Sequence, residues 1–183
     1  QSPYKVSALE GIKAAVGAGV VVHHAVDGDA AVKAARAADV AIVVVGNHPT
    51  CGPNMAREWT DAGTRPRAEP GDGREGRDRE TLALAQEALV KRVLAANPQT
   101  VMVLMSSFPY TINWSKAHVP AIVQMAHSSQ DQGTALARVL FGDYNPGGKL
   151  VSTWPASEKS LPPIMDYDIR HGHTYLYARA APL

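Results

Sequence analysis

The chain has 183 residues, of which 45% are hydrophobic and 19% are charged, and its formal net charge is +1. This length and apolar content suffice for one well-buried globular domain. The nearly neutral balance, without a dense Lys/Arg block, gives no electrostatic case for binding nucleic acid. The longest aliphatic runs, Val40–Val45 and Val101–Met105, are far too short to cross a membrane. Neither nucleic acid nor a membrane is therefore an expected partner.

Strand and helix patterns alternate in the first half of the chain. Gly19–Val26 is typical of a strand, and the Ala-rich Asp29–Ala38 is typical of a short helix. Val40–Val45 is a continuous aliphatic run, as in strands that are buried on both faces of a parallel sheet. Thr81–Ala96 shows the clearest helical spacing of apolar residues, and Asn97-Pro98 ends it.

The second half continues this alternation. Thr100–Met105 and Val119–Met125 are predicted strands, and Asp131–Phe141 is a predicted helix with Gly142 placed for its C-cap. Leu150–Trp154 is the last predicted strand. We therefore expect an open, mostly parallel α/β sheet covered by helices on both faces, an α/β sandwich, in a single domain over residues 1–183.

The segment between Val45 and Thr81 does not fit this economical pattern. It has about 35 residues without clear periodicity, whereas connections in compact domains usually have about 2–6. Charged side chains crowd residues 57–80. This composition alone equally fits a solvated insertion, but the segment leaves the carboxyl end of a buried strand, where open α/β sheets place ligand sites. Position and length therefore favour a functional loop.

Three stretches of the sequence carry a resemblance to a known family. Arg74–Arg79 reads Arg-Glu-Gly-Arg-Asp-Arg and precedes an apolar helix. Gln130–Gly133 reads Gln-Asp-Gln-Gly, and Leu140–Leu150 contains Phe-Gly-Asp-Tyr-Asn-Pro-Gly-Gly-Lys. In this order the motifs resemble the C-terminal α/β domain of glycoside hydrolase family 3, whose members are mostly β-glucosidases and β-xylosidases. The likeness extends from about Ala8 to Tyr177.

The resemblance implies that the chain is one part of a retaining exo-β-glycosidase that acts on a β-linked oligosaccharide or glycoside. The family's nucleophile is an aspartate in an N-terminal (β/α)8 barrel domain, and 183 residues cannot include that barrel as well. The chain begins with Gln1, and it stops where many members continue into a β-sandwich domain. We therefore expect a piece of a larger enzyme, inactive by itself, with the barrel as its partner.

Glu75 is the preferred general acid/base. Many family members carry a Glu-Gly-x-Asp-Arg signature in this loop, which Glu75–Arg79 matches, and in several the acid/base lies at or a few residues before it. The flanking Arg74 and Arg77 would each lower the pKa of Glu75 if they lay close, which disfavours an acid. The choice of Glu75 therefore requires these arginines to point to other carboxylates or to the substrate.

Glu58 is the alternative acid/base, and Glu69 is a weaker one. Glu58 stands beside Trp59, and an aromatic ring next to a carboxyl group can stack on a sugar and remove water from the acid. The loop varies so much among members of the family that both assignments stay open.

His48, Arg77 and Asp78 are the candidate substrate-binding residues. His48 follows the Val40–Val45 strand, and Gly46–Pro49 matches a Gly-x-His-Pro element of some family members. The imidazole of His48 and the amide of the preceding Asn47 could hydrogen-bond sugar hydroxyls there, although a turn whose histidine bonds the main chain is equally consistent. Arg77 and Asp78 would line the pocket or orient the acid.

No metal or cofactor is expected. His23 and His24 would point to opposite faces of a strand, and His171 and His173 have no evident third ligand. The glycine-rich stretches lack the phosphate-binding pattern and its strand-to-helix setting.

Two other functions fit parts of the sequence. One is a non-catalytic module that stabilises a larger glycosidase or binds sugar. The other is a free-standing flavodoxin-like binding protein.

Overall fold

The computed structural model describes residues 4–26, 28–47, 79, 81–127 and 129–178. Its centre is a three-stranded parallel sheet in the order β1-β2-β3. The strands are β1 (Ala41–Gly46), β2 (Thr100–Met105) and β3 (Ala121–Met125). Gly46 pairs with Met105, and Met105 pairs with Met125. The carboxyl ends of the three strands therefore lie level at one edge of the sheet.

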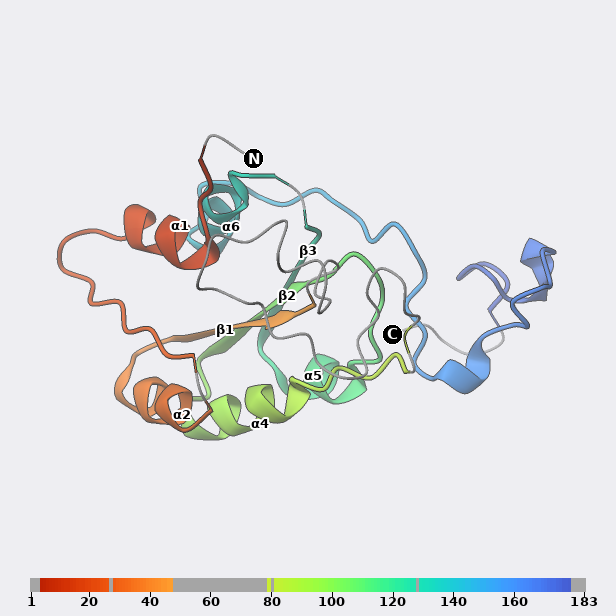
Figure 1. The fold of residues 1–183 in the computed structure, drawn as a ribbon, viewed down its shortest axis with the longest axis horizontal. Helices are drawn as coiled ribbons and strands as arrows, with labels where there is room; N and C mark the ends of the chain where they lie inside the picture. Colours follow the sequence, from red (N-terminus) through yellow and green to blue (C-terminus); the bar gives the residue numbers. More distant parts are fainter. Residues whose placement is uncertain (1–3, 27, 48–78, 80, 128, 179–183) are drawn as a thin grey trace, which may run out of the picture.

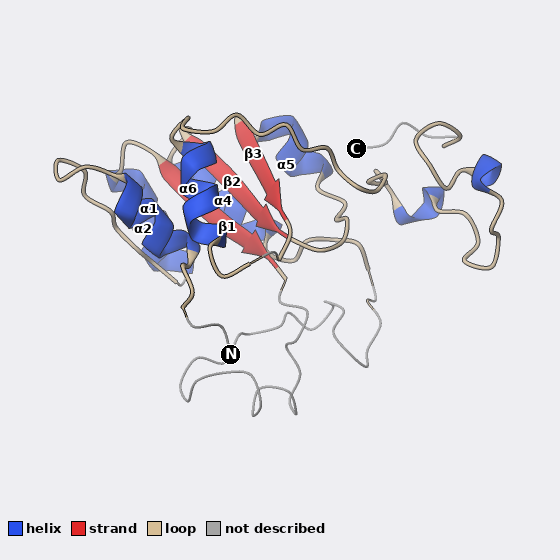
Figure 2. Ribbon diagram, turned by 90° about the horizontal axis from the view of Figure 1, so that it is seen from above, coloured by secondary structure: helices blue, strands red, loops and turns tan. Residues whose placement is uncertain are grey.

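Helices cover both faces of this sheet (Figure 1, Figure 2). One face carries α1 (Ala8–Ala15) and α6 (Gln132–Leu140), and the other carries α2 (Gly28–Ala37), α4 (Glu87–Ala96) and α5 (Asn113–His118). The expected α/β sandwich is confirmed. In the described part of the chain, no helix has the length and apolar character that crossing a bilayer requires.

The core is built around the central strand. Met102, Val103 and Leu104 of β2 are completely buried, because helices cover both faces of that strand and β1 and β3 cover its two edges. Val90 and Val93 of α4 are buried against the same sheet. Full burial of each such side chain stabilises the fold by about 1.5–3 kcal/mol, which explains why β2 is aliphatic without alternation.

Local signals set the ends of two helices. Ser7 and Glu10 form a capping box at the start of α1: the Ser7 hydroxyl accepts from the Glu10 N–H, and the Glu10 carboxylate accepts from the Ser7 N–H. The Ser7 N–H, and then the Ser7 hydroxyl, which also donates to the carboxylate at 2.8 Å, hold the pKa of Glu10 below its usual range. The C-cap of α6 is Phe141, and Gly142 follows it in the left-handed region with a φ of 86°. The predicted glycine therefore ends this helix, one residue beyond the C-cap position expected for it.

Two glycines allow α1 and α6 to touch along their main chains. A Cβ on Gly11 would lie 2.0 Å from the carbonyl oxygen of Gly133, and a Cβ on Gly133 would lie 2.0 Å from that of Ser7. Two main-chain bonds fix the same contact: Val6 donates to Gln130 at 2.7 Å, and Gly133 donates to Val6 at 3.0 Å. Any side chain at either glycine would therefore force the two helices apart.

Five of the predicted elements are confirmed; one has the predicted ends, and the others differ from them by at most two residues. They are Asp29–Ala38, Val40–Val45, Thr100–Met105, Val119–Met125 and Asp131–Phe141.

Two predicted strands are wrong. Gly19–Val26, all of which is described, contains no strand and crosses from α1 to α2 with Val21 and Val26 mostly exposed. Leu150–Trp154 is also fully described and contains no strand; Trp154 is buried in the hydrophobic core and Val151 is fully exposed. Alternation and β-branched residues favour a strand, but a strand also needs a neighbour to pair with.

The predicted helix Thr81–Ala96 begins later, at Glu87. Before that residue the main chain is used for tertiary contacts. The Leu82 carbonyl accepts from the Thr111 N–H at 2.8 Å, and Ala83 forms an isolated parallel bridge with Thr111. A strand-like segment therefore precedes α4 where helical spacing predicted its first turns.

The chain after α6 extends away from the sandwich (Figure 1, Figure 2). It contains two short 3₁₀ helices, η1 (Glu158–Ser160) and η2 (Ile169–His171). A hydrogen bond connects the end of this segment to its beginning: the Tyr175 N–H donates to the Thr153 hydroxyl at 2.9 Å.

Candidate functional site

Three polar residues lie together at the carboxyl edge of the sheet: Asn47, Ser106 and His127. The Asn47 N–H donates to the Met105 carbonyl at 3.1 Å, and the Ser106 N–H donates to the Met125 carbonyl at 2.9 Å. These bonds continue the sheet ladder beyond its last pairs. His127 Nε2 lies 3.5 Å from Asn47 Oδ1, at the long limit of a hydrogen bond. The edge thus carries an amide and an imidazole, which can both donate to and accept from hydroxyl groups.

Asn47 is nearly buried at this edge, with 7% of its surface exposed. Within the described residues its Nδ2 has no hydrogen-bond partner. Burying an amide donor without a partner costs about 1–3 kcal/mol, so such groups are usually satisfied by another group. A hydroxyl or carbonyl oxygen of a ligand would therefore bind most favourably at this point of the edge, where it can accept a hydrogen bond from Asn47 Nδ2.

Ser106 has a structural role. It is 1% exposed, and its hydroxyl donates to the Phe108 carbonyl and accepts from the Phe108 N–H at 3.1 Å. The side chain of Gln124 donates to the Ser106 carbonyl at 3.0 Å. These contacts form the turn that leads the chain out of β2, and they leave the hydroxyl engaged rather than available as a nucleophile.

Arg79, the last residue of the loop signature, packs on the segment that follows β2. Its guanidinium lies 4.0 Å from the centre of the Phe108 ring and 4.4 Å from that of the Tyr110 ring. Its Nη1 donates to the Pro109 carbonyl at 2.9 Å. A cation over two aromatic faces is favourable by about 0.5–2 kcal/mol for each contact, depending on burial. The end of the signature is therefore attached to the carboxyl side of the sheet.

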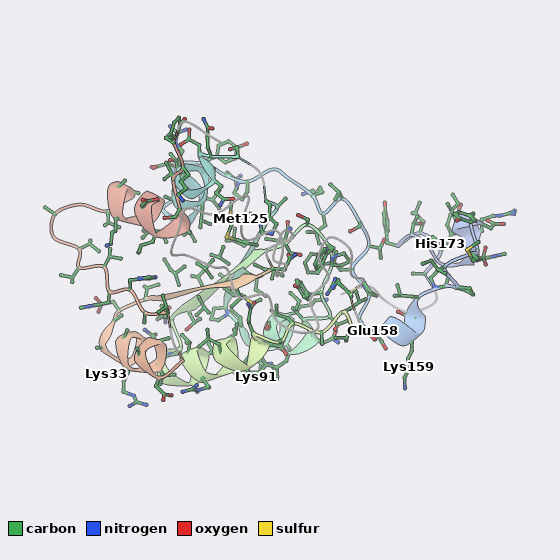
Figure 3. The ribbon with its side chains drawn as sticks, in the orientation of Figure 1. Lys33, Lys91, Met125, Glu158, Lys159 and His173 are labelled. Carbon is green, nitrogen blue, oxygen red and sulfur yellow. The ribbon has the colours of Figure 1, made fainter. Side chains whose placement is uncertain are left out.

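Glu158 of η1 completes this attachment. One carboxylate oxygen accepts from the Thr81 hydroxyl and from the Leu82 N–H, each at 2.5 Å. The hydrogen bond from Thr81, then that from Leu82, lower the pKa of Glu158, and the positive charge of Arg79 adds to this effect. Figure 3 shows Glu158 at the start of the extended C-terminal segment.

A second group of charges lies farther along that segment. The Arg170 side chain donates to both carboxylate oxygens of Asp168 and lowers the pKa of that carboxyl group to about 2. His171 Nδ1 lies 2.7 Å from Asp166 Oδ2. In the part of the chain that the structure describes, no three His, Cys, Asp or Glu side chains are arranged to hold a metal ion. These contacts join neighbours in sequence and shape η2.

The candidate residues from the sequence fall outside the described residues. They are His48, Glu58, Glu69, Glu75, Arg77 and Asp78. The described chain resumes beside them, at Asn47 on one side and Arg79 on the other. Their roles therefore stay predictions.

Sequence reasoning missed three contributors to this edge: His127, the aromatic pair under Arg79, and Glu158. Asn47 was expected there, because it directly follows a buried strand. The position of His127 just beyond β3 was a similar signal. Nothing local marks Glu158, which lies 76 residues from Leu82.

Comparison with known proteins identifies the family. The model of the glycosyl hydrolase family 3 C-terminal domain matches residues 1–180. A beta-xylosidase of Formosa agariphila is 31% identical over 173 residues, which cover 87% of this chain and 21% of that protein.

Solved structures agree with this match. Beta-D-glucoside glucohydrolase of Trichoderma reesei superimposes with a TM-score of 0.69 and 25% identity, over 91% of this chain and 22% of that one. A Kluyveromyces marxianus beta-glucosidase in complex with glucose superimposes with a TM-score of 0.58 and 26% identity. The match covers 87% of this chain and 17% of that one. The chain spans about one fifth of the length of these relatives. The chain belongs to the glycosyl hydrolase family 3 C-terminal domain family.

Proposed function

We propose that the chain is part of a retaining exo-β-glycosidase of the β-glucosidase or β-xylosidase type, and that it contributes the general acid/base and part of the sugar pocket. The observation that carries this proposal is the attachment of Arg79 to the carboxyl edge of the sheet. Open α/β sheets bind ligands at the carboxyl edge of the sheet, and Arg79, the last residue of the signature, is attached to that edge. The names of the relatives supply the reaction class.

Glu75 is proposed as the acid/base, with Glu58 as the alternative. In the first step its protonated carboxyl group donates to the oxygen of the leaving group while a partner carboxylate attacks the anomeric carbon. In the second step the same group, now ionised, takes a proton from the water that releases the sugar. The attacking carboxylate would lie about 5–5.5 Å away and would come from the barrel domain.

Burial must hold the acid protonated, and nearby cations oppose this. Arg79 contributes its positive charge to Glu158, and its guanidinium lies over Phe108 and Tyr110. The positive charge of Arg79 thus acts on Glu158. The proposal also requires Arg74 and Arg77 to be directed to other carboxylates or to the substrate, and Glu58 stays the alternative.

The sugar pocket is proposed to use His48, Arg77 and Asp78 from the loop, next to Asn47 and His127 of the sheet edge. Asn47 has a buried donor without a partner among the described residues. Sugar hydroxyls both donate and accept, so amide, imidazole and carboxylate groups are suitable partners for them.

Glu75→Gln in the full-length protein tests the acid/base. We would measure hydrolysis of aryl β-glucosides and β-xylosides with good and poor leaving groups, with and without azide. The proposal expects turnover of poor leaving groups to collapse, glycosylation with good ones to survive, and azide to restore turnover. Rates equal to the parent would move the role to Glu58, and Glu58→Gln is the matched variant.

A non-catalytic stabilising or sugar-binding module is the second candidate. The C-terminal segment favours it, since Ile164, Met165 and Tyr167 are 76–89% exposed and clustered exposed apolar residues mark interaction surfaces. It predicts that neither Glu75→Gln nor Glu58→Gln loses more than about a few-fold in rate.

A further inference from the structure

Three segments far apart in sequence meet beside Arg79, and we call their meeting point the loop-end joint. It consists of residues 81–83 with Arg79, residues 108–113, and residues 154–158. The Thr111 N–H donates to the Leu82 carbonyl at 2.8 Å. The Asn113 side chain donates to the Ala156 carbonyl at 2.7 Å. The middle segment therefore binds both of the others.

Glu158 connects the first and third segments directly. Its Oε1 accepts two hydrogen bonds, from Thr81 Oγ1 and from the Leu82 N–H, both at 2.5 Å. Bonds to an ionised acceptor are shorter and about twice as strong as those between neutral groups. Trp154, four residues earlier, is buried in the core, so the carboxylate sits on a segment that is itself anchored.

Charges around the joint keep this carboxylate ionised. Arg79 is close enough to Glu158 to lower its pKa, in addition to the two hydrogen bonds. Among the described residues, Lys159 is the charged side chain next to Glu158 in sequence, and it extends away from the domain (Figure 3). The joint thus contains the hydrogen bonds that Glu158 accepts, and the positive charge of Arg79 adds to them.

We propose that Glu158 is a positioning residue for the glycosidase reaction, because its carboxylate fixes the chain directly after Arg79 and thereby the carboxyl end of the signature. This inference rests on the proposed function. Glu158 would touch neither substrate nor reacting atoms. Its effect would pass through Thr81 and Leu82, since a catalytic group displaced by about 1 Å can lose about a hundredfold in rate.

Glu158→Ala and Glu158→Gln in the full-length protein provide the test. Alanine removes the acceptor of both hydrogen bonds, whereas glutamine keeps an acceptor oxygen and loses only the charge. Lys159→Ala is the matched control at the neighbouring exposed position. For each variant we would measure amide hydrogen exchange at Leu82, and kcat and KM with good and poor aryl leaving groups.

The expected result is selective. Glu158→Ala should lower kcat on poor leaving groups by about tenfold, leave KM within about twofold, and speed exchange of the Leu82 amide. Glu158→Gln should recover most of the rate, and Lys159→Ala should match the parent. Thr81→Val removes the hydrogen bond that the Thr81 hydroxyl donates to Glu158 and the one that it accepts from the Ala83 N–H at 3.1 Å. It changes the shape little, keeps the bond from the Leu82 N–H to Glu158, and should show a smaller loss in the same direction.

Two results would overturn the inference. One is a Glu158→Ala enzyme with parental rates on every leaving group, even with faster exchange at Leu82. The other is an equal loss on good and poor leaving groups in Glu158→Ala together with parental rates in Thr81→Val. The hydrolysis rates of Glu75→Gln and Glu58→Gln test the proposed function separately. If those rates change as expected while Glu158→Ala keeps the parental rates, only the positioning role is wrong.

Discussion

The main-chain N–H of Gly46 donates to Oε1 of Gln86 at 2.7 Å. This bond spans 40 residues and joins the carboxyl end of β1 to the residue that precedes α4. The charged loop therefore leaves and re-enters the sandwich at neighbouring points. Closing a long loop costs little more than closing a short one, so fixed ends make a long insertion compatible with a stable sheet.

Gln86→Leu should lower the free energy of unfolding by about 1 kcal/mol, because the Gly46 N–H loses its acceptor. Gln86→Glu keeps an oxygen at the same position and should be closer to the parent. Urea denaturation followed by circular dichroism measures both. Identical midpoints for the parent and Gln86→Leu would show that water replaces the side chain without cost.

Gly46→Ala should be far more damaging. Gly46 has a φ of 140°, and a Cβ there would lie 1.9 Å from the Met105 carbonyl oxygen. The left-handed conformation alone costs about 1–3 kcal/mol for other residues, and the overlap would also break the pairing of β1 with β2. Gly147→Ala is the control, since nothing lies within 4 Å of its added Cβ, and it should stay within about 0.5 kcal/mol of the parent. Equal thermal midpoints for the two variants would contradict the clash.

The contribution of Glu158 to stability should depend on pH. The hydrogen bonds from Thr81 and Leu82 lower its pKa in the folded state below the ordinary value of 4.5. A carboxylate with a lowered pKa stabilises the fold above the unfolded pKa, and this stabilisation is lost as pH falls through the folded pKa.

The unfolding midpoints of the parent and Glu158→Gln should therefore differ by a constant amount above about pH 5 and converge in more acidic solution. Urea titrations across this range would measure the difference. A difference that grows on acidification would mean that the carboxylate is destabilised by its surroundings in the folded state.

The isolated 183-residue chain should fold but should not hydrolyse aryl β-glycosides. The proposed mechanism needs a second carboxylate as nucleophile, and that group is expected from the barrel domain. Circular dichroism would verify folding, and the full-length protein would serve as the positive control. Turnover by the chain alone at the full-length rate would refute the division of the site between two domains.

The local pattern of apolar residues was sufficient to predict much of the fold. Val40–Val45 and Thr100–Met105 are aliphatic runs of strand length, and they became the neighbouring strands β1 and β2. Burial on both faces is found for β2, whereas Val44 of β1 is 41% exposed. The same reasoning failed for Gly19–Val26, which has the residues of a strand but no pairing in the structure. Strand formation depends on a partner, and one segment's composition does not say whether a partner is near.

The sequence by itself determined the class of fold, the family, and the loop in which the acid/base is expected, because these depend on periodicity and on motifs of adjacent residues. Only the tertiary structure decided that Arg79 lies over Phe108 and Tyr110, and that Glu158 accepts from Thr81 and Leu82. Such contacts join residues that are distant in sequence. Their geometry is set by the packing of whole strands and helices, which no short pattern encodes.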